Sequence, residues 1–238
     1  VSEDGLRGYV KTSDTREIYT ETVSYAYDEP KYTSLSLGEK VKLGWAGIYT
    51  YGGNDAYYEL TELASGMNVY CPTWYYLNDG KGDLNLLSDP DYVVRAHEDG
   101  YKVWALMSDV DYDFVEQVLT HTSVRQQVIK KLMDDMIETD VDGINIDFER
   151  IMSDYGEDYI QFLRELSIEC RREGKFLTVD NYAPYDYNAC YHIEEQSRLC
   201  DYVIIMVYDD YLGTGQMGPN SSLPFIKDVM DIDRKSVV

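Results

Sequence analysis

The sequence predicts an α/β fold, and two observations support this from residue 41 onward. Strand-like apolar runs alternate with helix-like segments, and the strand runs are apolar along almost their whole length. Such runs are typical of parallel strands covered by helices. The predicted strands are Val41–Trp45, Asn68–Tyr76, Tyr101–Met107, Gly143–Phe148, Phe176–Val179 and Tyr202–Val207.

Helical periodicity marks the segments between these strands. Pro90 opens one helix, which Gly100 stops, and Ser123 is expected to cap another in which apolar residues recur every fourth position. The predicted helices are Asn54–Ala64, Pro90–Glu98, 124–136, Glu157–Arg172 and Ala189–Arg198, with a further one starting at Leu223.

Two architectures fit this alternation. A doubly wound sheet would carry a glycine-rich phosphate loop after its first strand, and Tyr51-Gly52-Gly53 does not match that pattern. A TIM barrel needs eight strands and about 250 residues, and about six strands are found here. We therefore expect a (β/α)8 TIM barrel over residues 40–238 that is incomplete on its C-terminal side.

The two ends of the chain differ from this pattern. Residues 1–39 are expected to be the end of a small β module, similar to bacterial SH3-like domains, followed by a linker. Residues 233–238, DRKSVV, resemble a translated sequencing adapter, which predicts a truncated reading frame that lacks strands seven and eight. Open edges on strands one and six would be an aggregation hazard. We expect the fragment alone to be unstable and poorly active.

The composition argues against several classes of partner and of functional site. A formal net charge of -23 argues against nucleic acid and anionic lipid as partners. No apolar run approaches the length of a membrane helix, so membrane insertion is not expected. Three distant histidines and four scattered cysteines argue against a metal site or a Ser-His-Asp triad. No cofactor and no metal are expected. A disulfide between Cys190 and Cys200 is possible from the sequence.

The segment richest in candidate chemistry runs through Asn145, Asp147 and Glu149. With a period of two these residues share one side of a strand, which is the interior of a barrel, and Glu149 lies at the C-terminal tip where barrel active sites are built. Burying such groups is costly. Two acids two positions apart tend to hold one proton between them at neutral pH. A general acid must carry such a proton. The alternative is that these acids lie at a solvated strand end and have no role in a site.

Residues 142–149, DGINIDFE, resemble the signature Asp-Gly-x-x-x-Asp-x-Glu of glycoside hydrolase family 18, the chitinase-like barrels. All four fixed positions match, and they fall on the fourth predicted strand. Together with residues 68–74 and 92–106, they are similar to the bacterial branch that contains spore-cortex-lytic N-acetylglucosaminidases. The resemblance covers roughly residues 41–230.

The resemblance implies a role for each residue of this strand. Glu149 would protonate the glycosidic oxygen, and Asp147 would orient the N-acetyl group of the sugar and stabilise the charged ring intermediate. Asn145, where many members carry Asp, could still hydrogen-bond Asp147. The family mechanism is substrate-assisted: the N-acetyl oxygen attacks the anomeric carbon, and water opens the intermediate with retention of configuration.

A second segment, Met206-Val207-Tyr208-Asp209, resembles the Met-x-Tyr-Asp segment of the family. The resemblance implies that the Tyr208 hydroxyl bonds the N-acetyl carbonyl, and that Met206 and Asp209 line the same subsite. The alternative is that Tyr208 is an aromatic residue of the core. Three more residues at predicted strand tips are candidates for sugar contact, with structural packing as the alternative: Trp74, Asn181 and Tyr182.

The expected function is cleavage of β-linkages next to N-acetylglucosamine in peptidoglycan or chitin-like glycans. The expected partner is an N-acetylglucosamine-containing polysaccharide, the protein is expected to be a monomer, and its location is expected to be extracellular or cell-wall associated. The alternative is a sugar-binding protein without catalysis on the same barrel. The presence of Glu149 argues against that alternative, since such proteins typically lose the acid.

Overall fold

The computed structural model of the chain describes residues 9, 11–14, 34–109, 112–211 and 217–236. The chain divides into two units, Val1–Lys31 and Tyr32–Val238. In the first unit, the described part holds one 3-10 turn, Thr12–Asp14. The predicted SH3-like module therefore lies largely outside the described residues, and so do residues 237 and 238 of the predicted adapter segment.

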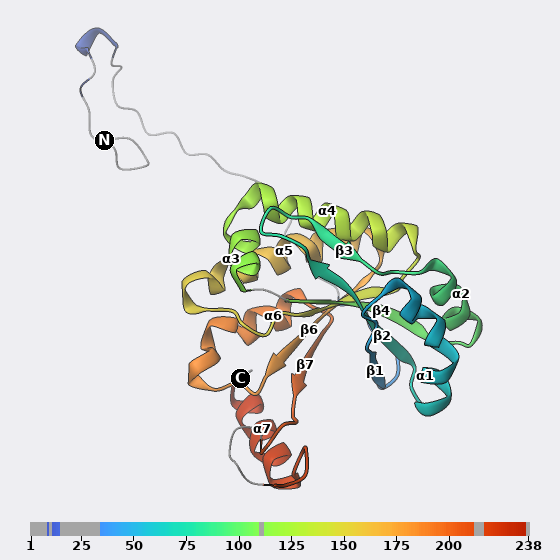
Figure 1. Cartoon of the computed structure of the whole chain (residues 1–238). Coiled ribbons are helices and arrows are strands. Elements are labelled where there is room, and N and C mark those ends of the chain that lie inside the picture. The colour runs from blue at the N-terminus through green and yellow to red at the C-terminus, as the bar shows by residue number, and fades with distance from the viewer. Residues whose placement is uncertain (1–8, 10, 15–33, 110–111, 212–216, 237–238) are drawn as a thin grey trace. The chain divides into compact units, whose positions relative to one another are not determined.

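The second unit is built on one curled sheet with helices on its outer face (Figure 1). Six strands are parallel in the order β1-β2-β4-β5-β6-β7, and a short β3 pairs antiparallel with β2. The strands are β1 Leu43–Ala46, β2 Val69–Leu77, β3 Leu84–Leu86, β4 Lys102–Ser108, β5 Gly143–Asp147, β6 Phe176–Tyr182 and β7 Tyr202–Met206. The incomplete (β/α) barrel predicted from the sequence is confirmed.

Helices connect the parallel strands. They are α1 Tyr57–Leu63, α2 Pro90–Glu98, α3 Tyr112–Thr120, α4 Thr122–Glu138, α5 Gly156–Glu173, α6 Ile193–Leu199 and α7 Leu223–Ser236. Short 3-10 segments span Tyr51–Ala56, Ser153–Tyr155 and Asp186–Tyr191. None of the described helices has the length and apolarity needed to cross a membrane.

Several helix ends differ from the prediction. The cap expected at Ser123 is wrong, because α4 starts at Thr122, two residues earlier than expected, and His121 is its N-cap, without a side-chain cap bond. The helix expected from Ala189 is a 3-10 segment followed by α6. The start of α2 is as predicted: Pro90 is its first residue, and the Asp89 side chain accepts from the Asp91 amide at 3.0 Å.

Two apolar clusters hold the sheet in place. The larger cluster fills the space between the strands and helices α2 to α6. The smaller one lies inside the curl, where Val69, Cys71, Trp104 and Leu106 are its fully buried members. Trp104 of β4 stacks on Tyr202 of β7 with ring centroids 5.6 Å apart. In the sheet order, β4 and β7 are three strand spacings apart, which in a flat sheet would be about 14 Å. The two rings can therefore meet only because the sheet is curled.

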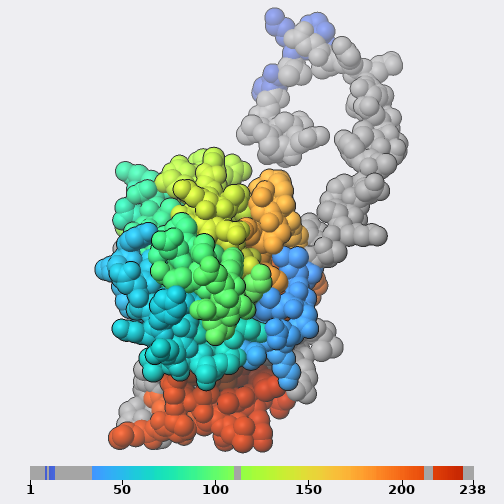
Figure 2. Space-filling view, turned by 90° about the vertical axis from the view of Figure 1, so that its right-hand side faces the viewer, coloured from blue at the N-terminus to red at the C-terminus, as the bar shows by residue number. Residues whose placement is uncertain are grey.

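The chain that precedes β1 crosses the same end of the curl. The Leu35 amide donates to Asp201 at 2.6 Å, and the Leu37 amide donates to the Tyr202 hydroxyl at 3.0 Å. At the other edge of the unit, α7 lies beyond the last strand, as the red segment of Figures 1 and 2 shows. The interior is therefore closed by side chains at the N-terminal ends of the strands, which leaves the carboxyl ends for a pocket.

Candidate active site

Strand β5 carries the acids into the curl. Ile144, Ile146 and Phe148 belong to the cluster under the helices, where Phe148 stacks on Phe162 of α5 with centroids 5.8 Å apart. Because side chains alternate along a strand, Asn145 and the following acids point to the opposite face. The predicted division of this strand into an apolar and a polar side is confirmed.

Asn145 is completely buried on the inner face. Its Oδ1 accepts from Trp45 Nε1 at 3.2 Å and from Cys71 Sγ at 3.4 Å. Its Nδ2 donates to Thr178 Oγ1 and Asp180 Oδ1, each at 3.0 Å. An amide side chain offers two donor hydrogens and one carbonyl oxygen with two lone pairs, so these four contacts use its full capacity. The expected hydrogen bond from Asn145 to Asp147 is therefore not formed.

Asp147 lies one step further along the inner face. Its Oδ1 is buried and has no hydrogen-bond partner among the described residues. Burial raises the pKa of this carboxyl to about 8, and the nearby charges of Asp180, Glu149 and Asp109 add to the effect. A carboxyl in this setting favours its neutral form at neutral pH.

Glu149 follows β5 and is half-buried. The Tyr182 hydroxyl at the end of β6 donates a hydrogen bond to Glu149 Oε2. Burial and this contact with Glu149 raise the pKa of Tyr182. On the other side, Asp109 Oδ2 accepts from the Arg150 amide at 3.2 Å, and burial raises the pKa of Asp109 to about 6. Glu149 thus lies at the rim, beside a hydroxyl and two further acids.

The chain after β7 supplies another wall of the pocket. The Tyr208 hydroxyl donates to Met206 Sδ at 2.9 Å, and the Tyr208 ring meets Trp45 edge to face at 6.5 Å. Burial, with Asp147 and Glu149, raises the pKa of Tyr208 to about 12. The Asp209 side chain is exposed, and its backbone has a left-handed φ of 61°. Met206 and Tyr208 therefore join Asp147, while Asp209 stays outside the pocket lining.

A pocket of about 290 Å³ opens inside the curl at the carboxyl ends of the strands. Its lining is largely aromatic and polar and includes two acids. Its lining consists of Trp45, Tyr49, Thr73, Tyr76, Leu106, Ser108, Asp147, Asp180, Met206 and Tyr208.

The structure does not bring Trp74 to this pocket. Trp74 is fully buried on the helix side, where its Nε1 donates to Asn54 at 2.8 Å and its ring meets Tyr92 at 5.2 Å. The reason is the alternation of faces along β2, which puts Cys71 and Thr73 on the inner face and therefore Trp74 on the outer one. Sugar contact by Trp74 is therefore a wrong prediction.

The same correction applies to Asn181. Strand β6 runs on to Tyr182, so its alternation places Thr178, Asp180 and Tyr182 on the inner face and Asn181 on the outer one. Asn181 is buried, and its amide exchanges two hydrogen bonds with that of Gln196 of α6, at 2.6 and 3.1 Å. Asn181 therefore packs the helix layer.

Asp180 was not predicted as a site residue, because the strand was expected to end at Val179. An acid two positions after Thr178 in an apolar run was the available signal, since polar residues at alternate positions mark an inner face. Trp45, Tyr49, Thr73 and Tyr76 were also missed. Their place in the lining depends on how β1 and β2 meet β5 across the curl.

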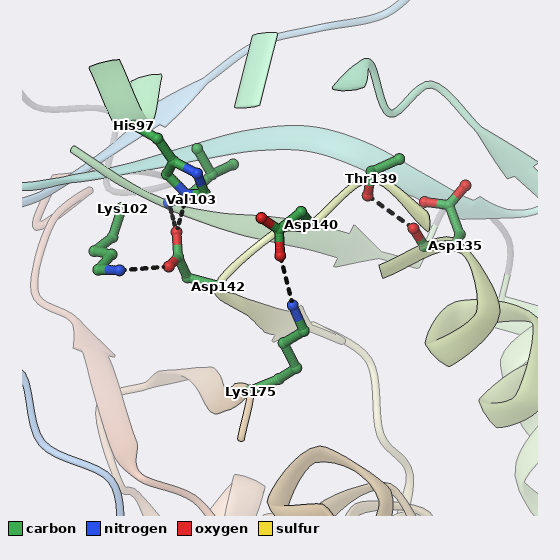
Figure 3. Close-up of polar contacts among 8 residues, drawn as sticks. All are labelled: His97, Lys102, Val103, Asp135, Thr139, Asp140, Asp142 and Lys175. Carbon is green, nitrogen blue, oxygen red and sulfur yellow. Dashed lines mark hydrogen bonds and ion pairs between the residues drawn. The ribbon is translucent and has the colours of Figure 1, made fainter. Parts of the chain in front are cut away.

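The signature begins at Asp142, directly before β5 and therefore at the N-terminal end of the strand. Asp142 accepts from His97 Nε2 at 2.8 Å, Lys102 Nζ at 2.7 Å and the Val103 amide at 2.9 Å (Figure 3). These bonds join β5 to β4 and α2. Asp142 is therefore a structural residue of the motif, far along the strand from Glu149.

A curled parallel sheet with acids at the carboxyl ends of its strands is the arrangement of a barrel enzyme. The pattern of Glycosyl hydrolases family 18 matches residues 79–236, and the chain belongs to this family. An uncharacterized glycosylase of Bacillus subtilis (strain 168), YvbX, is 23% identical over 222 residues, which are 84% of this chain and 62% of the relative.

Solved structures share the fold. A chitinase from Chromobacterium violaceum ATCC 12472 aligns with a TM-score of 0.69 and 22% identity, over 83% of this chain and 65% of that one. The spore cortex-lytic enzyme SleL of Bacillus cereus aligns with a TM-score of 0.72 and 15% identity, over 82% of this chain and 47% of that one. The chain thus spans less than two thirds of the length of these proteins.

Proposed function

We propose that the protein is a glycosidase that cleaves β-linkages next to N-acetylglucosamine in peptidoglycan or chitin-like glycans. The observation that carries this proposal is the pair on one inner face: Asp147, whose Oδ1 is buried and whose pKa is raised, and Glu149 at the rim beside it. Family membership and relatives named as chitinases and a cortex-lytic enzyme support the substrate class. A substrate of this kind implies a site of action outside the cytoplasm or in the cell wall.

The mechanism is retaining and substrate-assisted. Glu149 donates its proton to the glycosidic oxygen, and that bond breaks as the N-acetyl carbonyl oxygen attacks the anomeric carbon. Asp147, which is neutral at the start, accepts the N-acetyl N–H on its carbonyl oxygen, while the Tyr208 hydroxyl turns from Met206 to the N-acetyl oxygen. Glu149 then takes a proton from the water that opens the ring. Before the first step, the substrate displaces the Tyr182 hydroxyl from Glu149.

The test is hydrolysis of muropeptide and chitooligosaccharide substrates by the wild-type protein and by Glu149→Gln. We expect the variant to lose about 10²–10⁴-fold in kcat, which is the usual contribution of a general acid. Glu138→Gln is the matched control, because Glu138 is exposed on α4 outside the pocket, and it should keep wild-type activity.

Two outcomes would contradict the proposal. Equal hydrolysis by wild type and Glu149→Gln would exclude Glu149 as the acid. Sugar binding by both proteins with cleavage by neither would favour a binding protein on the same barrel.

A further inference from the structure

Asp180 is a second carboxyl inside the pocket, and the mechanism above does not use it. It lies on the inner face of β6, is 2% exposed, and lines the same pocket as Asp147. In the part of the chain that the structure describes, no salt bridge joins a Lys or Arg side chain to either acid. Two buried carboxyls of this kind do not both ionise easily, so the pair retains a proton near neutral pH.

Hydrogen bonding decides where this proton lies. Asp180 Oδ1 accepts the Asn145 amide hydrogen at 3.0 Å, whereas Asp147 Oδ1 is buried without a partner. A donated hydrogen bond favours the ionised form of a carboxyl, and burial without a partner favours the neutral form. The proton therefore belongs on Asp147 and the negative charge on Asp180.

We propose that Asp180 is a positioning residue that supplies the carboxylate missing at position 145 and so keeps Asp147 protonated before substrate binds. Asn145 cannot fill this role, because an amide carries no charge and its four contacts are already used. Asp180 acts from the neighbouring strand, and Asn145 bridges the two strands. The inference rests on the proposed function, in which Asp147 acts on the N-acetyl group.

The directions of the pKa shifts agree with this assignment. Burial raises the pKa of both acids, but the hydrogen bond from Asn145 lowers that of Asp180, whereas the charges of nearby acids raise that of Asp147 further. Other titratable groups face Asp180 from each neighbouring element. Their charges interact with that of Asp180, and they are Cys71 of β2, Glu149 after β5, Tyr159 of α5 and Tyr208 after β7.

The first measurement is an infrared titration of protonated carboxyl groups in the 238-residue chain, without substrate. The Asp147 band is assigned by its absence from Asp147→Asn. In Asp180→Asn, we expect this band to disappear at a pH lower by about one unit or more, because the neighbouring negative charge is gone. Asp201→Asn is the matched control: Asp201 is a partly buried acid at the other end of the same strands, and its loss should leave the band in place. An unchanged Asp147 band in Asp180→Asn would overturn the proposal.

The second measurement uses the double variant Asn145→Asp/Asp180→Asn, which moves the carboxyl from β6 to β5. We expect the Asp147 band to return towards its wild-type pH, a rescue that a purely structural role for Asp180 would not produce. Circular dichroism shows whether each variant folds. If Asp180→Asn alone does not fold, the double variant still provides the test. A band that stays at low pH in the folded double variant would count against the inference.

Kinetics then separate this inference from the proposed function. If the wild type cleaves, the alkaline limb of kcat/KM against pH should move to lower pH in Asp180→Asn by the same amount as the infrared band. An unmoved limb would overturn the role of Asp180 while leaving the glycosidase proposal intact. If the wild type cleaves nothing, the infrared result still decides whether Asp180 controls the Asp147 proton.

Discussion

At the scale of single residues, two acids on one strand have different surroundings. Asp147 has a buried oxygen with no donor and other acids nearby, whereas Glu149 accepts from the Tyr182 hydroxyl at the rim. Neighbours and burial, not residue type, therefore separate the two roles. This is how a site divides acid chemistry between similar groups.

The raised pKa of Asp147 predicts a pH dependence of folding stability. The folded-state pKa is about 8 and the ordinary value is 3.8. The folded state therefore binds this proton more tightly, so its stabilising contribution is complete below about pH 4 and is lost as the pH rises through about 8. We expect Asp147→Asn to match the wild type in stability at about pH 4, where the carboxyl is largely neutral in both states.

At pH 9 the variant should be more stable than the wild type, by about 1–3 kcal/mol, because it avoids a buried charge. Urea unfolding at both pH values measures the difference. A gap that does not widen with pH would contradict the predicted environment of Asp147.

At the scale of elements, Gly143 shows why the signature strand needs a glycine at its start. A Cβ at this position would lie 2.6 Å from both the Cβ and the carbonyl oxygen of Phe176, and 3.0 Å from Trp104 Cδ1. Strands β4, β5 and β6 therefore pack at this point with no room for a side chain. Asp142, one residue earlier, joins the same strand to β4 and α2 (Figure 3).

We expect Gly143→Ala to destabilise the protein by about 1–3 kcal/mol, the usual effect of overpacking. Urea denaturation gives the free energy of unfolding. Gly52→Ala is the control, because a Cβ there would meet no atom within 4 Å, and it should be nearly neutral. Equal stability of the two variants would show that β5 and β6 can separate at no cost.

At the scale of the whole molecule, charge is the dominant feature. The chain carries 44 acidic and 21 basic residues, so most carboxylates have no cation to pair with. Their mutual repulsion destabilises a compact state, and salt screens it. Several of the ion pairs among the described residues are exposed pairs on single helices, which contribute little to stability.

We therefore expect the melting temperature to rise when NaCl is increased from about 0.01 M to about 0.5 M. Differential scanning calorimetry measures it. Repeating the scan at pH 5, where fewer carboxylates are ionised, should give a smaller increase. A fall in melting temperature with salt would mean that attractive ion pairs outweigh the repulsion.

Sequence periodicity could predict the barrel and the core of its site. The apolar strands, the helix that begins at Pro90 and the alternation from Asn145 to Glu149 depend on residues close together in the chain. Strand β3 was missed because its three residues gain their form from pairing with β2. Helix α3 was missed as well, although it packs Val115, Val118 and Leu119 into the main cluster.

By itself the sequence determined the chain order of the six parallel strands, the family signature, and the acids at the end of β5 that face the barrel interior. Only the tertiary structure decided that the register shift in β2 brings Tyr76 into the pocket lining, that Asn145 bonds Asp180 instead of Asp147, and that the extra length of β6 places Asp180 in the pocket. The physical reason is that alternation along a strand is a local property, whereas register and contact across a curled sheet depend on strands far apart in the chain.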